Sequence, residues 1–320
     1  MNTERVNIER RRVMAAAVLG REVEQTGAIP GCKPPLVAVI GEIREVTERL
    51  IVVEKMDGRE ERLIIAPWAT AWRGGPVSPA GLRPGSRVII RVVRSGRVVD
   101  RIWADITRMT GTILGITRDD RSDRGGHTLD LDCGPHRGRR TVIVPSEVAG
   151  RIQVRHPRFE PGYLFDAIGT RIDGVSLALL PATSQPTYRA DAVPPPSSYD
   201  TQPKISGAAV WSDVFDDDEA GVAYPMLERD DAHCDQAGFS CAGLPYLSLG
   251  STLSIHNACT DRAAILPIIA CGCLTGRFRD RCVECGTSPR GRTTELSPLA
   301  YVELGGELTH GCFNARIGLG

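Results

Sequence analysis

A sequence repeat in the N-terminal half constrains the fold more than any other feature of this chain. Three short motifs recur there in the same order, and the second copies follow the first by 70, 78 and 77 residues. Nearly constant offsets indicate a duplicated structural unit with one loop of different length. The matched motifs begin at Gly41 and Gly111 (GEI and GTI), at Leu63 and Thr141 (LIIAP and TVIVP), and at Arg83 and Glu160 (RPGS and EPGY).

Each copy is predicted to be a small β-barrel. From Leu36 onward, apolar side chains recur at every second position, which is typical of strands with one buried face. Met56-Asp-Gly-Arg59 supplies a hairpin turn. Short strands with glycine-rich corners fit an OB-like barrel, so we expect one barrel at residues 36–107, a second at 108–181 and no substantial helix in either. The alternative is a chance similarity between two β segments.

The segments that flank these barrels are predicted to be a helix and a linker. Residues 3–25 have the pattern of a short amphipathic helix, which the Gly- and Pro-rich stretch 27–35 would end. Residues 1–35 would therefore form a helix and connector. Residues 182–208 are rich in proline and are predicted to be a stiff, extended linker.

Charge and hydropathy argue against two classes of partner. The chain has 39 basic and 39 acidic residues, and neither predicted small barrel shows a basic stripe interleaved with aromatic residues, so nucleic acid is not expected. No stretch approaches the roughly 20 apolar residues of a membrane span. A basic start at residues 10–12 resembles an export signal, but its apolar run is short and no small-residue cleavage site follows.

Cysteines are concentrated in the last third of the chain, where eight of the ten follow residue 233. An even number in one short domain indicates four disulfides, and hence the cell envelope or exterior, although a cytoplasmic location stays open without a clear signal. The alternative is a zinc site of four thiolates from Cys271, Cys273, Cys282 and Cys285. The predicted disulfide residues are Cys234, Cys241, Cys259, Cys271, Cys273, Cys282, Cys285 and Cys312.

The C-terminal region, residues 209–320, also carries motifs of a known family. A Leu-Pro turn at Leu244 leads into a strand that ends at Asn257, Thr260-Asp-Arg262 follows as a turn, and Glu295-Leu-Ser precedes a short predicted helix, 297–304. In their order and spacing these motifs resemble the double-psi β-barrel of the rare-lipoprotein-A and expansin type over residues 244–317. The resemblance implies a closed barrel with a cleft for cell-wall glycan.

The sequence departs from that family at the positions that carry its chemistry. If no gap follows Asn257, Ala270 takes the place of the family's barrel Asp, and Cys241 takes the place of its His. A second alignment, with a long insertion, makes Glu284 the acid, eleven residues before Glu295. We favour the first alignment, which leaves the barrel without its acid.

Several other side chains are candidates for a site. Glycan cleavage requires a positioned acid and a second group that stabilises charge. The acidic run at 213–219 has enough carboxylates for calcium but lacks EF-hand spacing, so we expect a solvated loop. Aromatic side chains of the first barrel could stack on a ligand, although core packing is the more ordinary role. The candidates are Glu284 and Glu295 as catalytic residues, Asp280 or His233 beside them, and Trp68, Trp72 and Trp103 for stacking.

The sequence therefore predicts an all-β chain with a short N-terminal helix, two OB-like barrels and a Cys-rich double-psi β-barrel. We expect a protein whose third barrel binds polysaccharide, peptidoglycan or a protein partner without catalysis and without a cofactor. Two alternatives remain open. One is a peptidoglycan-cleaving lytic transglycosylase that uses Glu284, and the other is a zinc-stabilised structural or scaffold protein.

Overall fold

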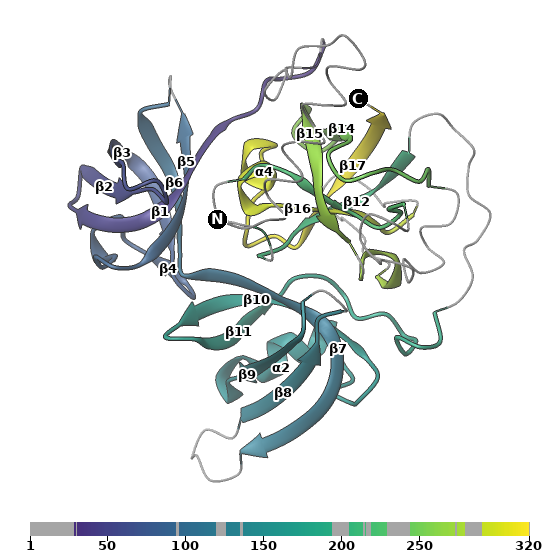
Figure 1. Cartoon of the computed structure of the whole chain (residues 1–320). Helices are drawn as coiled ribbons and strands as arrows, with labels where there is room; N and C mark the ends of the chain where they lie inside the picture. Colours follow the sequence, from purple (N-terminus) through teal and green to yellow (C-terminus); the bar gives the residue numbers. More distant parts are fainter. Residues whose placement is uncertain are drawn as a thin grey trace.

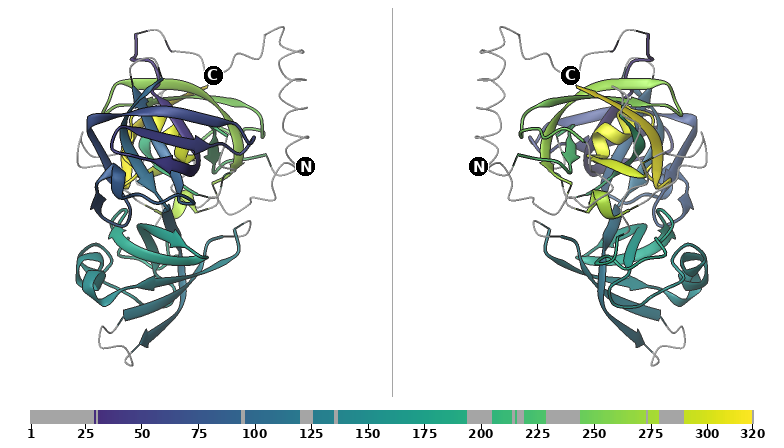
Figure 2. Two further views of the ribbon diagram at one scale, coloured as in Figure 1. Left: turned by 90° about the vertical axis from the view of Figure 1, so that its left-hand side faces the viewer. Right: turned by 90° about the vertical axis from the view of Figure 1, so that its right-hand side faces the viewer.

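The computed structural model describes residues 29, 31–93, 96–119, 126–134, 137–193, 205–213, 215, 219–228, 244–272, 274–278 and 290–319. The helix expected at 3–25 lies outside these residues. In the described part the strands close into three barrels in chain order, which confirms the all-β prediction. In Figure 1 the first barrel and the third lie side by side with the second below them. The views in Figure 2 keep that second barrel below the other two.

The first barrel contains strands β1 to β6. Its strand order is β2-β1-β5-β6-β3, and pairing of β2 with β3 closes it, while β4 extends β3. Apolar side chains at alternate positions fill its interior. The predicted turn forms at residues 56–59, with Gly58 at φ +78°. The bounds are β1 Val37–Val46, β2 Leu50–Glu54, β3 Glu60–Trp72, β4 Pro76–Val77, β5 Arg87–Val93 and β6 Val98–Ala104.

The second barrel repeats the strand pairing of the first. If the short β4 is left aside, each barrel has five strands, of which the first is antiparallel to the second and fourth (β1 to β2 and β5, β7 to β8 and β10). The third strand is parallel to the fifth (β3 to β6, β9 to β11). Five strands with these pairings give both units the OB-like arrangement predicted from the sequence. The bounds are β7 Ile106–Asp119, β8 Gly126–Asp132, β9 Arg139–Val144, α2 Ser146–Arg155, β10 Leu164–Ile172 and β11 Val175–Pro181.

Matched residues of the two barrels play the same structural part. A Cβ on Gly41 or Gly111 would collide with the last backbone carbonyl of the neighbouring strand, at Glu54 or Asp132 respectively. Gly85 and Gly162 both have positive φ, and their amides donate to the carbonyls of Ile43 and Ile113, the matched residues of β1 and β7. The register shift of each first strand also begins at that isoleucine. The repeat is therefore a structural duplication.

Helix α2 corrects the expectation that neither small barrel contains a substantial helix. It occupies the connection between the third and fourth strands, outside the barrel wall. Pro145 precedes its first turn, Glu147 lies in that turn and Arg155 in the last, as the helix dipole favours. Ile152 is its only fully buried residue, so the sequence carries only a weak apolar period for this helix.

The third barrel contains six strands in the closed order β12-β16-β13-β15-β14-β17. Two neighbouring pairs, β12 with β16 and β13 with β15, are parallel, and the others are antiparallel. The predicted helix is present as α4, capped by the Ser297 hydroxyl and ended by Gly305 at φ +81°. The bounds are β12 Ile205–Trp211, β13 Val222–Tyr224, β14 Thr252–Asn257, β15 Arg262–Cys271, β16 Arg292–Leu296, α4 Pro298–Glu303 and β17 Cys312–Leu319.

One apolar cluster joins the three barrels. Trp72 and Trp103 of the first barrel and Ile168 of the second pack into the same cluster as the interior of the third. Two parts of the predicted linker are described, and its last residues, 205–208, belong to β12. The other part, 182–193, is docked, because the Tyr188 hydroxyl donates to the Arg277 carbonyl and the Ala190 amide donates to the Gly162 carbonyl. The barrels therefore form a single packed body in which a site can combine residues from distant parts of the chain.

Candidate metal centre

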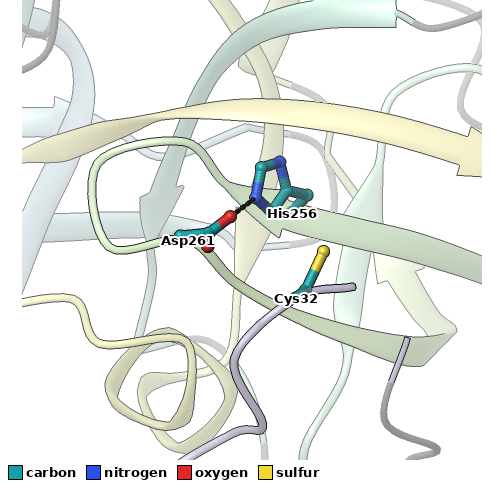
Figure 3. A group of neighbouring side chains, drawn as sticks. All are labelled: Cys32, His256 and Asp261. Atoms are coloured by element: carbon teal, nitrogen blue, oxygen red, sulfur yellow. Dashed lines mark hydrogen bonds and ion pairs between the residues drawn. The ribbon is translucent and has the colours of Figure 1, made fainter. Parts of the chain in front are cut away.

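Three metal-ligating side chains from two distant parts of the chain meet on the outer wall of the third barrel. They are Cys32, in the segment before the first barrel, and His256 and Asp261, in the β14–β15 hairpin (Figure 3). One ligand atom of each lies within 4.8 Å of the other two. The His256 Nε2 and Asp261 Oδ1 atoms are 3.0 Å apart.

Cys32 is placed by a short stretch of chain that crosses to the third barrel before β1 begins. The Lys33 amide donates to the Asp261 carbonyl at 2.8 Å, and Lys33 and Arg262 form an isolated parallel bridge. The Leu36 amide donates to the Glu303 carbonyl at 2.7 Å. Pro34 and Pro35 between these contacts keep the backbone extended. The thiol of Cys32 is partly buried and is not part of a disulfide.

His256 faces outward because β14 alternates strictly. Leu253, Ile255 and Asn257 are buried inside the barrel, so the side chain between the last two points to the outer wall. Its cross-strand neighbours are Ala263 on β15 and Arg316 on β17. The His256 side chain is 21% exposed, so a ligand can approach the ring from solvent.

Asp261 is the last residue of the turn that joins β14 to β15. It has φ +60°, a left-handed conformation that Asp tolerates better than most residues. Two hydrogen bonds to α4 fix the turn, because the Asn257 side-chain amide and the Thr260 hydroxyl both donate to the Leu304 carbonyl at the end of that helix. The position of the carboxylate is therefore set by the turn geometry and by the contact of the turn with α4.

The three ligands suit zinc in chemistry and nearly in spacing. Zinc takes thiolate, imidazole and carboxylate ligands at about 2.0–2.3 Å, so tetrahedral ligand atoms lie about 3.3–3.8 Å apart. In this group the His256 and Asp261 ligand atoms are 3.0 Å apart, and no separation exceeds 4.8 Å. Calcium and magnesium prefer oxygen ligands only. Among the residues that the structure describes, the group has three ligands, and tetrahedral zinc has a fourth position beyond these three.

Glu295, a predicted catalytic residue, lies elsewhere and is buried. It is 1% exposed on β16, and its Oε2 is 2.6 Å from the Nη2 of Arg137, which belongs to the second barrel. The Thr275 hydroxyl lies 3.4 Å from its other oxygen. A carboxylate paired with arginine and closed off from solvent is poorly suited to donate a proton to a glycan. The structure thus places Glu295 in the interface between two barrels.

The cysteines correct part of the disulfide prediction. Cys312 carries a thiol, so the eight C-terminal cysteines do not form four disulfides with one another. Cys259 and Cys271 are each disulfide-bonded, and a bonded Cys271 has no thiolate to offer the alternative zinc group. Predicted residues outside the described part are Cys234, Cys241, Cys273, Cys282, Cys285, Glu284, Asp280 and His233.

The remaining candidates divide between packing and ion pairing. Trp72 and Trp103 are buried in the shared apolar cluster, whereas Trp68 is 56% exposed on β3. Asp213, from the acidic run, lies 3.1 Å from the Arg140 guanidinium of the second barrel. Ala270, at the position of the family's Asp in the favoured alignment, is partly buried on β15 opposite Ala223. None of these described residues joins the metal-ligating group.

Sequence reasoning missed all three members of the candidate metal centre. Cys32 lies far from the Cys-rich region, and His256 and Asp261 were assigned only to a strand and a turn. The sequence did contain one signal for this site. A His near the end of a strand and an Asp five residues later in the following turn can lie close together in one hairpin. The missing information was the path of the N-terminal segment.

Comparison of the chain with models of known protein families, with curated proteins and with solved structures finds no match. Within the described ranges no helix has the length and apolar character needed to cross a bilayer.

Proposed function

We propose that this is a zinc-binding three-barrel protein in which one metal ion, held by Cys32, His256 and Asp261, fastens the N-terminal segment to the third barrel. The observation that carries the proposal is the convergence of a thiol, an imidazole and a carboxylate within 4.8 Å of one another. Their chemistry favours zinc over hard cations.

The metal would add to a junction that already exists. Backbone hydrogen bonds hold Lys33 and Leu36 to the third barrel, and the Cys32 sulfur lies within 4.8 Å of the His256 and Asp261 ligand atoms. Zinc binding would link the segment that contains Cys32 to the third barrel. It would also stabilise the folded state, because the metal binds the folded protein and not the unfolded chain. We therefore assign the ion a structural role first.

Zinc titration of the metal-free protein tests this function. Asp261→Asn should weaken zinc binding by more than about 100-fold, because loss even of outer-shell partners costs about 10–100-fold. Asp173→Asn is the matched control, since Asp173 also occupies a turn with positive φ but has no ligand neighbours in the metal-ligating group. It should bind like the wild type.

Calorimetry at fixed pH gives both affinities and the stoichiometry, which should be one zinc ion per chain. Binding should also weaken as the pH falls, because protons compete for the thiolate and the imidazole. Equal zinc affinity in the wild type, Asp261→Asn and Cys32→Ser would exclude the proposed ligands.

A second function is proposed for the same barrel, namely non-catalytic binding of polysaccharide. It is favoured by Tyr246, which is 66% exposed beside the Leu-Pro turn of the family resemblance. The turn is anchored, since the Tyr224 hydroxyl donates to the Pro245 carbonyl at 3.0 Å. An exposed ring on a fixed turn can stack on a sugar face. Burial of Glu295 against Arg137 supports binding without cleavage.

Co-sedimentation with insoluble cell wall or polysaccharide tests this second function. Tyr246→Ala should lower the bound fraction severalfold, whereas Trp68→Ala, which removes an exposed ring from the first barrel, should not. No soluble sugar should be released. Release of sugar fragments that disappears in Glu284→Gln would instead establish the lytic transglycosylase alternative.

A further inference from the structure

The surroundings of the metal centre carry an excess of positive charge. A zinc ion bound to one thiolate and one carboxylate has its charge balanced by those two ligands. Three cations lie on the same structural elements: Lys33 follows Cys32, Arg262 follows Asp261, and Arg316 is the direct cross-strand neighbour of His256. With the metal bound, the site as a whole would be positive.

Two of these cations are already engaged with the backbone. The Arg262 guanidinium donates to the Pro34 carbonyl, and the Lys33 ammonium lies 3.4 Å from the Thr260 carbonyl. They stabilise the crossing segment and add charge without being directed at the metal. Arg316 differs, because it is exposed and the described residues give it no ion-pair partner.

The register places Arg316 on the metal side of the barrel wall. Directly opposite residues of antiparallel strands project from the same face, with Cβ atoms about 4.5–5.5 Å apart. His256 and Arg316 are such a pair on β14 and β17, and the residues on either side of Arg316, Ala315 and Ile317, are buried inside. A guanidinium on this face can reach a group bound at the metal.

We propose that the open coordination position takes a small oxyanion, a phosphate or carboxylate group, which Arg316 also binds. The proposal rests on the zinc function above and names the class of ligand that this site would accept. One oxygen of the anion would bind the metal, and the planar guanidinium would pair with a second oxygen. The same geometry gives a neutral ligand no comparable gain.

The experiment uses the full chain loaded with cobalt(II), whose visible absorption reports changes in its ligands. Inorganic phosphate and acetate are titrated separately at constant ionic strength. We expect a saturable spectral shift with at least one of the two anions, and a dissociation constant raised about tenfold or more in Arg316→Gln. Arg316→Lys should retain part of the affinity. Arg83→Gln, which removes an exposed arginine from the first barrel, should match the wild type.

The outcomes separate the two proposals. If cobalt gives no thiolate charge-transfer band, the metal function itself is wrong. If the band appears but neither anion shifts the spectrum, or if Arg316→Gln and Arg83→Gln weaken the effect equally, the metal function stands and the oxyanion proposal is wrong. A shift with acetate alone or phosphate alone supports the proposal and identifies the oxyanion.

Discussion

Asp166 lies where the second barrel meets the third and is fully buried. Arg108 contacts both of its oxygens, at 2.9 and 2.6 Å, and Arg292 reaches it from the third barrel at 2.6 Å. Burial alone would raise the pKa of Asp166, but the two guanidinium charges and their hydrogen bonds outweigh burial and hold it well below its usual range. The carboxylate is therefore ionised and shared between two barrels.

Removal of that charge should destabilise the protein strongly. Asp166→Asn leaves the buried Arg108 without its counter-charge and removes the closer of the two carboxylates that Arg292 pairs with, the other being Glu295 at 3.8 Å. Loss of one partner of a buried ion pair typically costs about 3–5 kcal/mol. Urea unfolding should show this loss. Asp57→Asn removes a carboxylate of an exposed ion pair with Arg59 and should leave the unfolding midpoint nearly unchanged. Equal midpoints for the two variants would contradict the structural role of Asp166.

The buried His156 and the partly buried Glu303 have opposite effects on the pH dependence of stability. Burial lowers the pKa of His156 to about 4, so its contribution to stability is lost as the pH falls from about 6.5 through 4. Burial raises the pKa of Glu303 to about 7. Its folded form binds more protons than the unfolded one between about pH 4.5 and 7, so its contribution is lost as the pH rises through that window.

Glu303→Gln should therefore stabilise the protein in a pH-dependent way. The amide resembles the protonated acid, so the variant and the wild type should be equally stable near pH 4.5. At pH 8 the variant should be more stable by on the order of 3 kcal/mol, since each unit of pKa shift corresponds to about 1.4 kcal/mol. Urea unfolding at both pH values measures the difference. The same difference at pH 4.5 and pH 8 would show that Glu303 is not desolvated.

At the scale of elements, glycines mark where the duplicated barrels are tightest. Gly111 on β7 faces the backbone of β8, and a Cβ there would lie 2.7 Å from the Asp132 carbonyl oxygen. Gly150 lies in the middle of α2, and a Cβ there would meet nothing within 4 Å. The same substitution is therefore expected to have opposite effects at these two positions.

Gly111→Ala should destabilise the protein by about 1–3 kcal/mol, the usual cost of overpacking against atoms that cannot move aside. Gly150→Ala should stabilise it by about 0.5–1 kcal/mol, because alanine loses less entropy than glycine in a helix. Thermal unfolding measures both. A stabilising Gly111→Ala would mean that β7 and β8 do not approach as closely as the structure shows.

Elements with local sequence signals could be predicted, and those that depend on distant contacts could not. Alternation from Leu36 onward and the matched glycines indicated two barrels, and the helix predicted at 297–304 is present as α4. Helix α2 was missed because it buries little. The metal centre was missed because Cys32 reaches His256 only through the fold. The burial of Glu295 could not be foreseen, because its partner Arg137 belongs to another barrel.

At the scale of the whole molecule, the three barrels behave as one packed unit. Trp72 and Trp103 of the first barrel pack into the apolar cluster that contains the core of the third. At the same junction, the Glu307 carboxylate forms ion pairs with Arg91 and Arg101 of the first barrel. The N-terminal segment then returns to the outer wall of the third barrel. The candidate metal centre lies where this segment meets the third barrel. It therefore combines a residue that precedes the first barrel with two residues of the third.

Anomalous diffraction from a crystal grown with zinc tests the metal centre most directly. We predict one peak at the zinc absorption edge, within about 2.0–2.3 Å of the Cys32 Sγ, a His256 ring nitrogen and an Asp261 carboxylate oxygen. Crystals of Cys32→Ser grown in the same way should show a weaker peak or none. A wild-type crystal whose zinc lies elsewhere, with His256 and Asp261 still paired to each other, would contradict the proposed metal centre.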